Sequence, residues 1–301
     1  MVKQNILLII NPVAGRKKAK AISYQIVDSL CRNDFKTTIF TTSRKGEATD
    51  IVKEHASEIH RIICCGGDGT LNEVFTGLSM ANLQIPVGYI PTGTTNDLAH
   101  ALNLPTKIHK AIDTSINGQI RQHDIGAFNN ENQYFSYVAS FGAFTKTAYS
   151  TPQWIKNLIG HIAYVFSGIL SLADIHSHSV KIVADGKEIS GNFIYGSISN
   201  STVIGGVIKL PKSDIQFDDG KFEVMLIKDP KNPGGLRKVL HSLFHRCYDE
   251  RYVYYFKAKE LSFTFEKSTA WTVDGEFAGT HEDVYIKNLN RNAQVVVPIE
   301  S

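Results

Sequence analysis

Short apolar runs alternate with helix-periodic stretches over the first 120 residues of the chain. The apolar runs predict strands at 4–10, 35–41, 61–65 and 86–90. Apolar residues three or four positions apart predict helices near 16–32, 46–57, 70–79, 94–102 and 106–117. Strands that alternate with helices indicate an α/β domain built on a doubly wound parallel sheet. Ligands of such sheets bind at the carboxyl ends of the strands.

The pattern changes near residue 120, where extended runs joined by turn signals take over. Asn129-Asn130-Glu131 separates runs at 120–129 and 132–141, and Asp185-Gly186 separates two more, so each predicts a β-hairpin. Further strands are expected at 222–228, 252–256, 259–266, 269–273, 282–287 and 293–299, with helices at 152–174 and 234–247. The second half is therefore predicted to be a mostly antiparallel β domain. The expected domains are 1–122 and 123–301.

The composition is that of a soluble globular protein, with 43% apolar and 20% charged residues. The net charge of +3 is small, and no nucleic-acid partner is expected. The four cysteines lack metal-ligand spacing and are typical of reduced thiols in a cytosolic protein. No apolar run suits a signal peptide or a membrane span, so any membrane contact is expected to be peripheral.

The third predicted strand is followed by Gly66-Gly67-Asp68-Gly69-Thr70-Leu71-Asn72-Glu73. The glycines let the backbone turn sharply and approach a ligand closely. Thr70 and Glu73 have the spacing of a capping box, which predicts a helix start. A helix N-terminus after a glycine turn favours phosphate, but Asp68 would repel a bare phosphate. A cation between them removes this conflict, so the segment predicts a Mg²⁺-nucleotide site; a plain strand-to-helix connection is the alternative.

Two further segments follow predicted strands and carry similar groups. Pro91 to Leu98 offers hydroxyls, a glycine and a carboxylate at a helix start. Thr94 and Asp97 again have capping spacing, so a helix cap is the alternative to a site in which Asp68 and Asp97 share a cation. Asn11 to Gly15 closes the first strand beside a basic cluster, and either cradles a nucleotide or forms an ordinary turn.

The common nucleotide-binding motifs are absent from the sequence. Asn72 stands where the dinucleotide fingerprint needs its third glycine, and no G-x-x-x-x-G-K-[ST] occurs. The H-R-D and D-F-G motifs of protein kinases are missing as well. A phosphotransferase with this sequence therefore belongs to another lineage.

Two acidic turns are candidates in the second half. Val273-Asp274-Gly275-Glu276 ends a predicted strand and is either a functional turn or an ordinary β-turn. The second turn, at 215–221, contains Asp218 and Asp219, and its carbonyls and one carboxylate could hold a hard cation.

Together these motifs resemble the diacylglycerol kinase catalytic-domain family, which includes bacterial lipid kinases and the sphingosine and ceramide kinases. The matching segments run in family order across nearly the whole chain: Asn11-Pro12, Gly66 to Glu73, Pro91 to Asp97, Asp124-Ile125-Gly126 and Val273 to Glu276. The resemblance implies a nucleotide-binding α/β domain, a β-rich lipid-substrate domain and a nucleotide site in the cleft between them. It also suggests that the last strand returns to the first domain.

The resemblance implies roles for individual residues. Catalytic Mg²⁺ would be organised by Asp68, Asp97 and Asp124, directly or through water, and Glu276 would accept the proton of the lipid hydroxyl. The contacts to ATP would come from Asn11, Pro12, Val13, Ala14, Gly15, Thr42, Gly67, Asp68, Gly69, Thr70, Leu71, Asn72, Glu73 and Thr94.

The resemblance also implies a structural Mg²⁺ at the second acidic turn. Asp219 would supply its carboxylate, and Gln216 and Lys221 their backbone carbonyls. The chain departs from the family at His100, where an arginine often follows the Asn-Asp-[FL]-Ala pattern. This departure puts the identity of the substrate in doubt more than the class of reaction.

The sequence thus predicts a cytoplasmic, ATP- and Mg²⁺-dependent lipid kinase that visits the inner face of the membrane, with diacylglycerol as the first candidate substrate. One alternative is a kinase of a soluble acceptor such as NAD. The other is a catalytically silent nucleotide- or lipid-binding regulator. The oligomeric state, a homodimer included, stays open.

Overall fold

The structure, a computed structural model, describes residues 4–129, 133–142, 176–201, 203–204, 208–209, 216–245 and 248–299. The chain divides into two compact units. The first unit comprises Met1–Ile125 and Asn290–Ser301, and the second comprises Gly126–Leu289. The division thus falls slightly later than the expected end of the first domain at 122, and the final segment belongs to the first unit.

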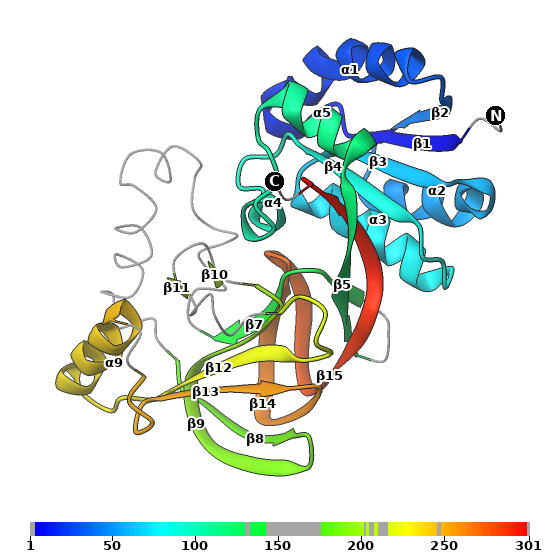
Figure 1. Cartoon of the computed structure of the whole chain (residues 1–301). Coiled ribbons are helices and arrows are strands. Elements are labelled where there is room, and N and C mark those ends of the chain that lie inside the picture. Colours follow the sequence, from blue (N-terminus) through cyan, green and yellow to red (C-terminus); the bar gives the residue numbers. More distant parts are fainter. Residues whose placement is uncertain are drawn as a thin grey trace. The chain divides into compact units, whose positions relative to one another are not determined.

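The first unit is built on a parallel sheet (Figure 1). Its strands are β1 (Asn5–Ile10), β2 (Lys36–Thr41), β3 (Arg61–Gly66) and β4 (Pro86–Pro91). They pair in the order β2-β1-β3-β4, and the end of β15 (Glu276–Val297) runs parallel to β4 through Gln294 and Val295. The four strands expected from the apolar runs are confirmed.

The central strands of this sheet are apolar at successive positions, and helices pack against the sheet to bury these side chains. They are α1 (Ala14–Arg32), α2 (Glu47–His55), η1 (Ala56–Glu58), α3 (Asp68–Met80), α4 (Asp97–Ala101) and α5 (Ile108–Asn117). Ile22 and Ile26 of α1 and Ile112 of α5 pack in one buried cluster with Ile6 and Leu8 of β1. The intervening β1 residues are buried as well, which explains why the strand reads as a continuous apolar run.

The second unit is mostly antiparallel (Figure 1). Its strands pair in the order β13-β12-β9-β7-β14-β15, and β8 pairs with both β14 and β9. The strands that follow β4 in the sequence, before β15, are β5 (Gln119–Phe128), β6 (Gln133–Phe135), β7 (Val138–Gly142), β8 (His178–Ala184), β9 (Lys187–Ser199), β10 (Val203–Ile204), β11 (Ile208–Lys209), β12 (Phe222–Lys228), β13 (Val253–Ala258) and β14 (Glu260–Val273). Strands β10 and β11 form a short pair, and helix α9 spans Pro233–His245. Both expected hairpins form: β5 pairs with β6 and β8 with β9.

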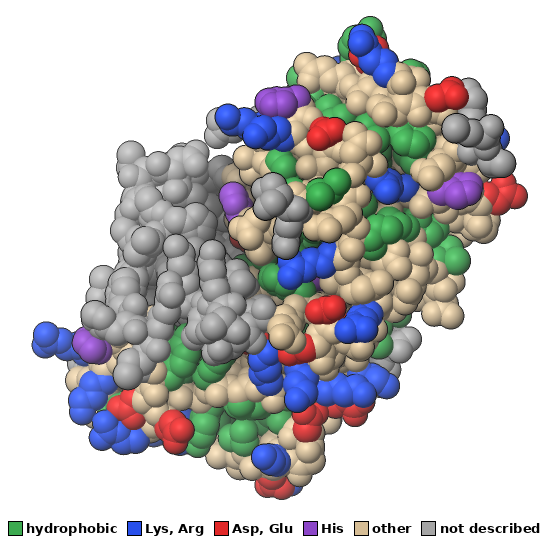
Figure 2. All heavy atoms as spheres, viewed as in Figure 1, with side chains coloured by type: hydrophobic (Ala, Val, Ile, Leu, Met, Phe, Trp, Pro, Cys, Tyr) green, Lys and Arg blue, Asp and Glu red, His purple; other side chains and the backbone are tan. Residues whose placement is uncertain are grey.

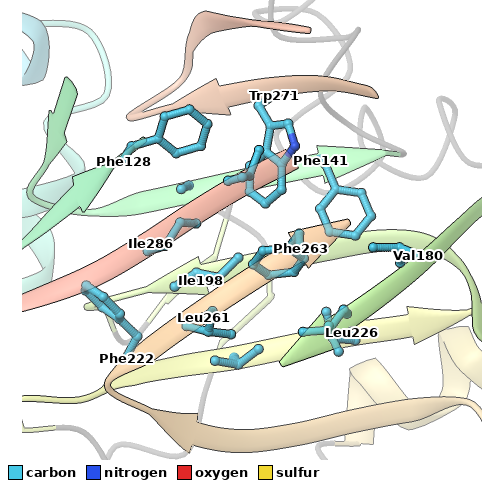
Figure 3. Close-up of a cluster of buried hydrophobic side chains, with 14 of the residues drawn as sticks. Phe128, Phe141, Val180, Ile198, Phe222, Leu226, Leu261, Phe263, Trp271 and Ile286 are labelled. Atoms are coloured by element: carbon cyan, nitrogen blue, oxygen red, sulfur yellow. The ribbon is translucent and has the colours of Figure 1, made fainter. Parts of the chain in front are cut away.

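An aromatic cluster forms the core of the second unit (Figure 3). The ring centroids of Phe141 and Phe263 lie 5.0 and 5.2 Å from that of Trp271. Gly196 lies opposite Phe141 on the neighbouring strand, where a Cβ would come within 2.2 Å of the Phe141 ring. The glycine therefore makes room for the cluster.

Two pairs of predicted strands are each one long strand in the structure. The runs at 259–266 and 269–273 are both part of β14, and those at 282–287 and 293–299 are both part of β15. The pairing of β14 with β15 shifts register between Thr264 and Thr269. Polar residues at this bulge interrupt the apolar pattern, so the sequence suggests that one strand ends there and another begins. The helix expected at 152–174 lies outside the described residues.

Candidate active site

Two glycine turns of the first unit pack backbone against backbone. Gly67 follows β3, and Gly93 follows β4. A Cβ on Gly93 would lie 2.7 Å from the Gly67 Cα, and one on Gly67 would lie 3.3 Å from the Gly93 Cα. The Thr92 N–H also donates a hydrogen bond to the Gly66 carbonyl over 2.8 Å. The close approach therefore requires glycine on both sides.

We expect a Gly93→Ala variant to lower the free energy of unfolding by about 1–3 kcal/mol, because an added Cβ meets backbone that cannot rotate away. Nucleotide affinity should fall as the two turns separate. Urea unfolding and ATP titration would measure the two effects. Gly191→Ala is the matched control, since its Cβ would meet only the Phe193 ring at 3.4 Å. Equal stability of both variants would contradict the expectation.

The Asp68 carboxylate joins the two turns. Asp68 is the first residue of α3, and its side chain accepts hydrogen bonds from the Asp97 N–H (3.0 Å) and the Leu98 N–H (3.4 Å) at the start of α4. Burial raises the pKa of Asp68, and the backbone donors oppose that rise by favouring the charged form. The Asp68 carboxylate thus contacts the backbone of Asp97, and the cation shared by the two carboxylates stays a prediction.

The capping box predicted at Thr70 and Glu73 does not form, and neither does the helix cap at Thr94 and Asp97 that was the alternative to a site. Helix α3 begins at Asp68 with Gly67 as its N-cap, and α4 begins at Asp97 with Asn96 as its N-cap; neither N-cap makes a side-chain capping hydrogen bond. Thr70 Oγ1 instead accepts a hydrogen bond from Asn11 Nδ2 over 3.0 Å. A partner from the end of β1 therefore takes the hydroxyl that the spacing assigned to a helix cap.

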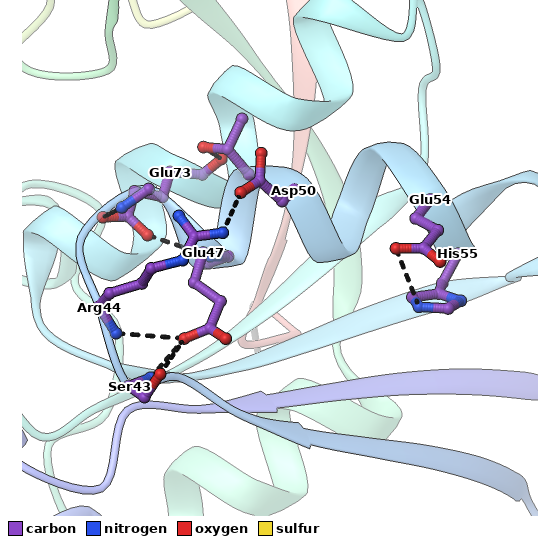
Figure 4. A network of polar contacts seen from close by, with 10 residues as sticks. Ser43, Arg44, Glu47, Asp50, Glu54, His55 and Glu73 are labelled. Atoms are coloured by element: carbon purple, nitrogen blue, oxygen red, sulfur yellow. Dashed lines mark hydrogen bonds and ion pairs between the residues drawn. The ribbon is translucent and has the colours of Figure 1, made fainter.

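Glu73 caps a different helix, α2 (Figure 4). Its carboxylate accepts hydrogen bonds from the Gly46 N–H (2.8 Å) and the Ala48 N–H (3.2 Å). The Thr49 hydroxyl donates to the Glu73 carbonyl over 2.8 Å. Glu73, which the resemblance assigned to ATP contact, therefore fixes the segment that follows β2.

Sequence reasoning missed a polar network in that segment (Figure 4). The Glu47 carboxylate accepts hydrogen bonds from the Ser43 hydroxyl (2.9 Å) and the Arg44 N–H (3.1 Å). Arg44 Nη2 donates to Asp50 at 2.6 Å, and this hydrogen bond raises the pKa of Arg44. Thr42 lies just before the network and is buried, with its N–H donating to the Ile10 carbonyl. The acidic first turn of α2 was the signal that could have indicated these caps.

The end of β1 reaches the same edge of the sheet. Asn11 donates to Thr70 through its side chain, and its N–H donates to the Cys65 carbonyl over 2.9 Å. Its Oδ1 accepts from the Val13 N–H, and α1 begins at the next residue, Ala14. The segments that end β1, β3 and β4 are therefore linked by hydrogen bonds or backbone contact. Within the first unit, this is the arrangement expected of a site at the carboxyl ends of parallel strands.

Asp124, the third predicted Mg²⁺ organiser, is fully buried at the end of the first unit's chain. Its Oδ1 accepts hydrogen bonds from Asn290 Nδ2 (3.0 Å) and from the Arg291 N–H (2.7 Å). These contacts fasten β5 to β15. The Asp68 carboxylate instead accepts a hydrogen bond from the Asp97 N–H. Its predicted role in metal binding stays a prediction.

In the second unit, Glu276 follows a tight hairpin turn. Asp274 (φ 46°) and Gly275 (φ 81°) form the turn between Val273 and Glu276, which pair across β14 and β15. Two successive positive φ angles fit the type I′ turn of two-residue hairpins. The Glu276 side chain is exposed. A candidate base is thus presented to solvent by a rigid turn.

The Asp274 carboxylate anchors that turn. It accepts hydrogen bonds from the Ser136 N–H (2.9 Å), the Ser136 hydroxyl (3.2 Å), the Tyr137 N–H (3.0 Å) and the Val138 N–H (2.9 Å). Burial raises the pKa of Asp274 to about 6, while these donors act in the opposite direction. The Asp-Gly signal predicted the turn, but sequence alone did not reveal the anchor.

The second acidic turn holds an ammonium group. The Asp219 carboxylate accepts a hydrogen bond from the Lys221 N–H at 2.9 Å and another from Lys257 Nζ at 2.8 Å. Lys257 Nζ also lies 3.4 Å from Glu223 Oε1. Gln216, the remaining predicted ligand, is exposed. The structure therefore gives the expected metal-binding carboxylate a lysine partner.

We expect Glu223 to make stability fall as pH rises from about 4.5 to about 7. Burial raises its pKa from 4.5 to about 7, with Lys257 opposing the rise. In that window the folded state holds a proton that the unfolded state has lost, so the free energy of unfolding falls by at most about 3 kcal/mol. Urea unfolding from pH 4 to pH 8 should show a flatter profile for Glu223→Gln. The exposed control Glu266→Gln should keep the wild-type slope.

The described part of the chain holds neither a clustered set of metal ligands nor a helix suited to span a membrane. Among those residues, no group of three or more His, Cys, Asp and Glu side chains could hold a metal ion. Within the described ranges, no helix combines the length and apolar character that a membrane span requires.

Comparisons with known proteins agree with this geometry. The family model described as diacylglycerol kinase catalytic domain matches residues 5–128. A diacylglycerol kinase from Bacillus subtilis (strain 168) is 34% identical over 97% of this chain and 96% of its own length. A diacylglycerol kinase from Staphylococcus saprophyticus subsp. saprophyticus is 30% identical over 97% of this chain and 94% of its own.

The fold also matches a solved structure. The crystal structure of a candidate diacylglycerol kinase from Bacillus anthracis str. Sterne superposes with a TM-score of 0.83 at 24% sequence identity. The match covers 98% of this chain and 95% of that chain, and it shows a shared fold. The family model and the curated relatives together show that the chain belongs to the diacylglycerol kinase catalytic-domain family.

Proposed function

We propose that this protein is an ATP- and Mg²⁺-dependent lipid kinase that transfers the γ-phosphate to a lipid hydroxyl, with diacylglycerol as the preferred acceptor. The observation that carries the proposal is the junction of the two glycine turns, where the Asp68 carboxylate meets the start of α4. The relatives named diacylglycerol kinase support the same acceptor.

The nucleotide phosphates bind at the linked ends of β1, β3 and β4. The N-terminus of α3 supplies backbone N–H groups and the positive end of its dipole. Gly67 and Gly93 allow the backbone of both turns to approach a ligand closely. Asn11 holds Thr70 of α3 in position. In this proposal Asn11 to Gly15, Thr42, Gly67 to Asn72 and Thr94 surround ATP, and Glu73 acts indirectly by holding the start of α2.

Asp68 and Asp97 suit a hard cation such as Mg²⁺. Carboxylate oxygens are its preferred protein ligands, and the two residues are joined by a hydrogen bond at the start of α4. Asp68 and Asp97 would hold Mg²⁺ there, and a bound divalent cation would supply the positive charge that neutralises charge developing during transfer. Asp124 is the third residue of the set that the family resemblance implies. Glu276 takes the proton of the lipid hydroxyl.

The acceptor lies in a membrane, so the enzyme visits the cytoplasmic face of the membrane from solution. Arg237 and Lys238 are exposed on α9, and Lys and Arg side chains gather over that part of the surface in Figure 2. Basic groups near an anionic leaflet each contribute about 1 kcal/mol to binding. Removing both charges should weaken binding to anionic vesicles.

The test is transfer of labelled γ-phosphate from Mg-ATP to lipids in mixed micelles. Diacylglycerol, monoacylglycerol, ceramide, sphingosine and phosphatidylglycerol are compared, with NAD as a soluble acceptor and Glu276→Ala as the blank. The proposal expects label in phosphatidic acid that disappears in the blank. Label in another lipid would replace the substrate and keep the mechanism. Label in NAD alone, or ATP binding without any transfer, would overturn the lipid kinase proposal.

A further inference from the structure

Asp219, in the described part of the second acidic turn (216–221), belongs to a three-membered charge cluster. Lys257 Nζ lies 2.8 Å from Asp219 Oδ2 and 3.4 Å from Glu223 Oε1. The cluster is fixed by sheet register, because Glu223 of β12 pairs directly with Lys257 of β13. Asp219 is held from the other side by the Lys221 N–H. We name these three residues, Asp219, Glu223 and Lys257, the lysine clamp.

The lysine clamp is shielded from water. The Glu223 side chain is fully buried, and those of Asp219 and Lys257 are 17% and 29% exposed. Among the described residues no donor meets the hydrogen-bond criteria for either carboxylate oxygen of Glu223, and Lys257 Nζ lies 3.4 Å from Oε1. A buried carboxylate needs a nearby cation, and the Lys257 ammonium supplies it. Partial burial disfavours the ammonium, but the hydrogen bond to Asp219 and the two carboxylate charges raise the pKa of Lys257.

A divalent ion does not fit this arrangement. The family resemblance implies a Mg²⁺ coordinated by the Asp219 carboxylate, yet one oxygen of that carboxylate faces the Lys257 ammonium and the other accepts the Lys221 N–H. A metal bound to Asp219 would lie next to a like charge in a poorly solvated place, where repulsion is strong. The metal and the ammonium therefore compete for the same carboxylate.

We propose that Lys257 is the resident cation of this acidic turn and takes the place of a divalent metal ion. The ammonium forms an ion pair with Asp219, lies 3.4 Å from Glu223, and ties the turn to β13. The turn therefore folds and stays folded without metal. Removing the ammonium converts the same oxygens into a metal site, because two carboxylates and the turn carbonyls are then left without a cation.

The first test uses the wild type without nucleotide at pH 8. Thermal unfolding is measured in EDTA and in 10 mM MgCl₂ or CaCl₂. The change in Tm caused by the metal should be the same for the wild type and for Asp219→Asn, because this turn contributes nothing to it. Calorimetric titration with Mg²⁺ should give the same isotherm for the wild type and Asp219→Asn, since any binding near Asp68 is common to both. A Mg²⁺-dependent rise in Tm that Asp219→Asn abolishes would overturn the proposal.

The second test removes the clamp. Lys257→Met should gain a Mg²⁺ or Ca²⁺ response, with Tm rising by about 2–4 °C when metal is at several times its Kd. The response should vanish in Lys257→Met/Asp219→Asn, and Lys257→Arg should show none. If Lys257→Met is unfolded without metal, recovery of folding on metal addition is the expected result. A Lys257→Met protein that neither binds nor is rescued by metal would contradict the proposal.

Neither test measures phosphate transfer. If the turn does not respond to metal but the enzyme is inactive, this inference stands and the proposed function fails. If the turn binds metal and the enzyme is active, the proposed function stands and this inference fails.

Discussion

A Glu276→Ala variant is expected to lose about 10²–10⁴-fold in kcat on a lipid acceptor while its free energy of unfolding stays near the wild-type value. Proton transfer from the acceptor hydroxyl is lost with the carboxylate. The fold is spared because the side chain is exposed and the backbone pairing of Glu276 with Val273 does not need it. Steady-state kinetics in mixed micelles and urea unfolding would measure both quantities.

Glu282→Gln is the matched control, since Glu282 is exposed on the same strand. It should keep wild-type turnover. A Glu276→Gln variant should be as slow as Glu276→Ala, because the amide keeps the shape of the side chain but cannot accept the proton. Full activity of Glu276→Gln would reject Glu276 as the base.

Asp274→Asn should lower the free energy of unfolding by about 2–4 kcal/mol, and it should slow turnover as well. The carboxylate accepts four hydrogen bonds from Ser136, Tyr137 and Val138, three of them from backbone N–H groups. An amide would present its own donor to some of these groups, and hydrogen bonds to a charged partner contribute about 1.5–3 kcal/mol each. Because Asp274 anchors the turn that carries Glu276, loss of the anchor should also misplace the base.

Urea unfolding would measure the stability change, and kinetics at a temperature where the variant is folded would isolate the effect on turnover. Asp283→Asn, an exposed substitution on β15, the strand that carries Glu276, should change neither. If Asp274→Asn lost stability but kept full turnover, Asp274 would support the fold without positioning Glu276.

The helices and strands could largely be predicted because the buried sheet of the first unit leaves a strong local signal. Strand β3 reads as the unbroken run Ile62 to Cys65, since both faces are buried. Strand β14 was divided in two because a bulge placed exposed polar residues within it. Local polarity resembles a turn, although the strand continues through pairing with distant partners.

The partners of the site residues could not be predicted, because they come from remote segments. Thr70 and Glu73 have the spacing of a capping box, but their actual partners lie after β1 and at the start of α2. The glycine turns were identified correctly as segments, whereas the contact of Gly67 with Gly93 depends on the order of the strands. Lys257 was missed entirely, since only the register of β12 and β13 brings it to Asp219.

The long strand β15 has a consequence for the order of events during synthesis. Gln294 and Val295 complete the first unit's sheet by pairing with Pro86 and Val87, and Arg291 and Asn290 satisfy the buried Asp124. While the ribosome is still translating the second unit, the nascent first unit lacks this edge strand. Contacts between such distant residues form late and slowly. The nascent first unit should therefore stay vulnerable to proteases and dependent on chaperones until the last strand has emerged.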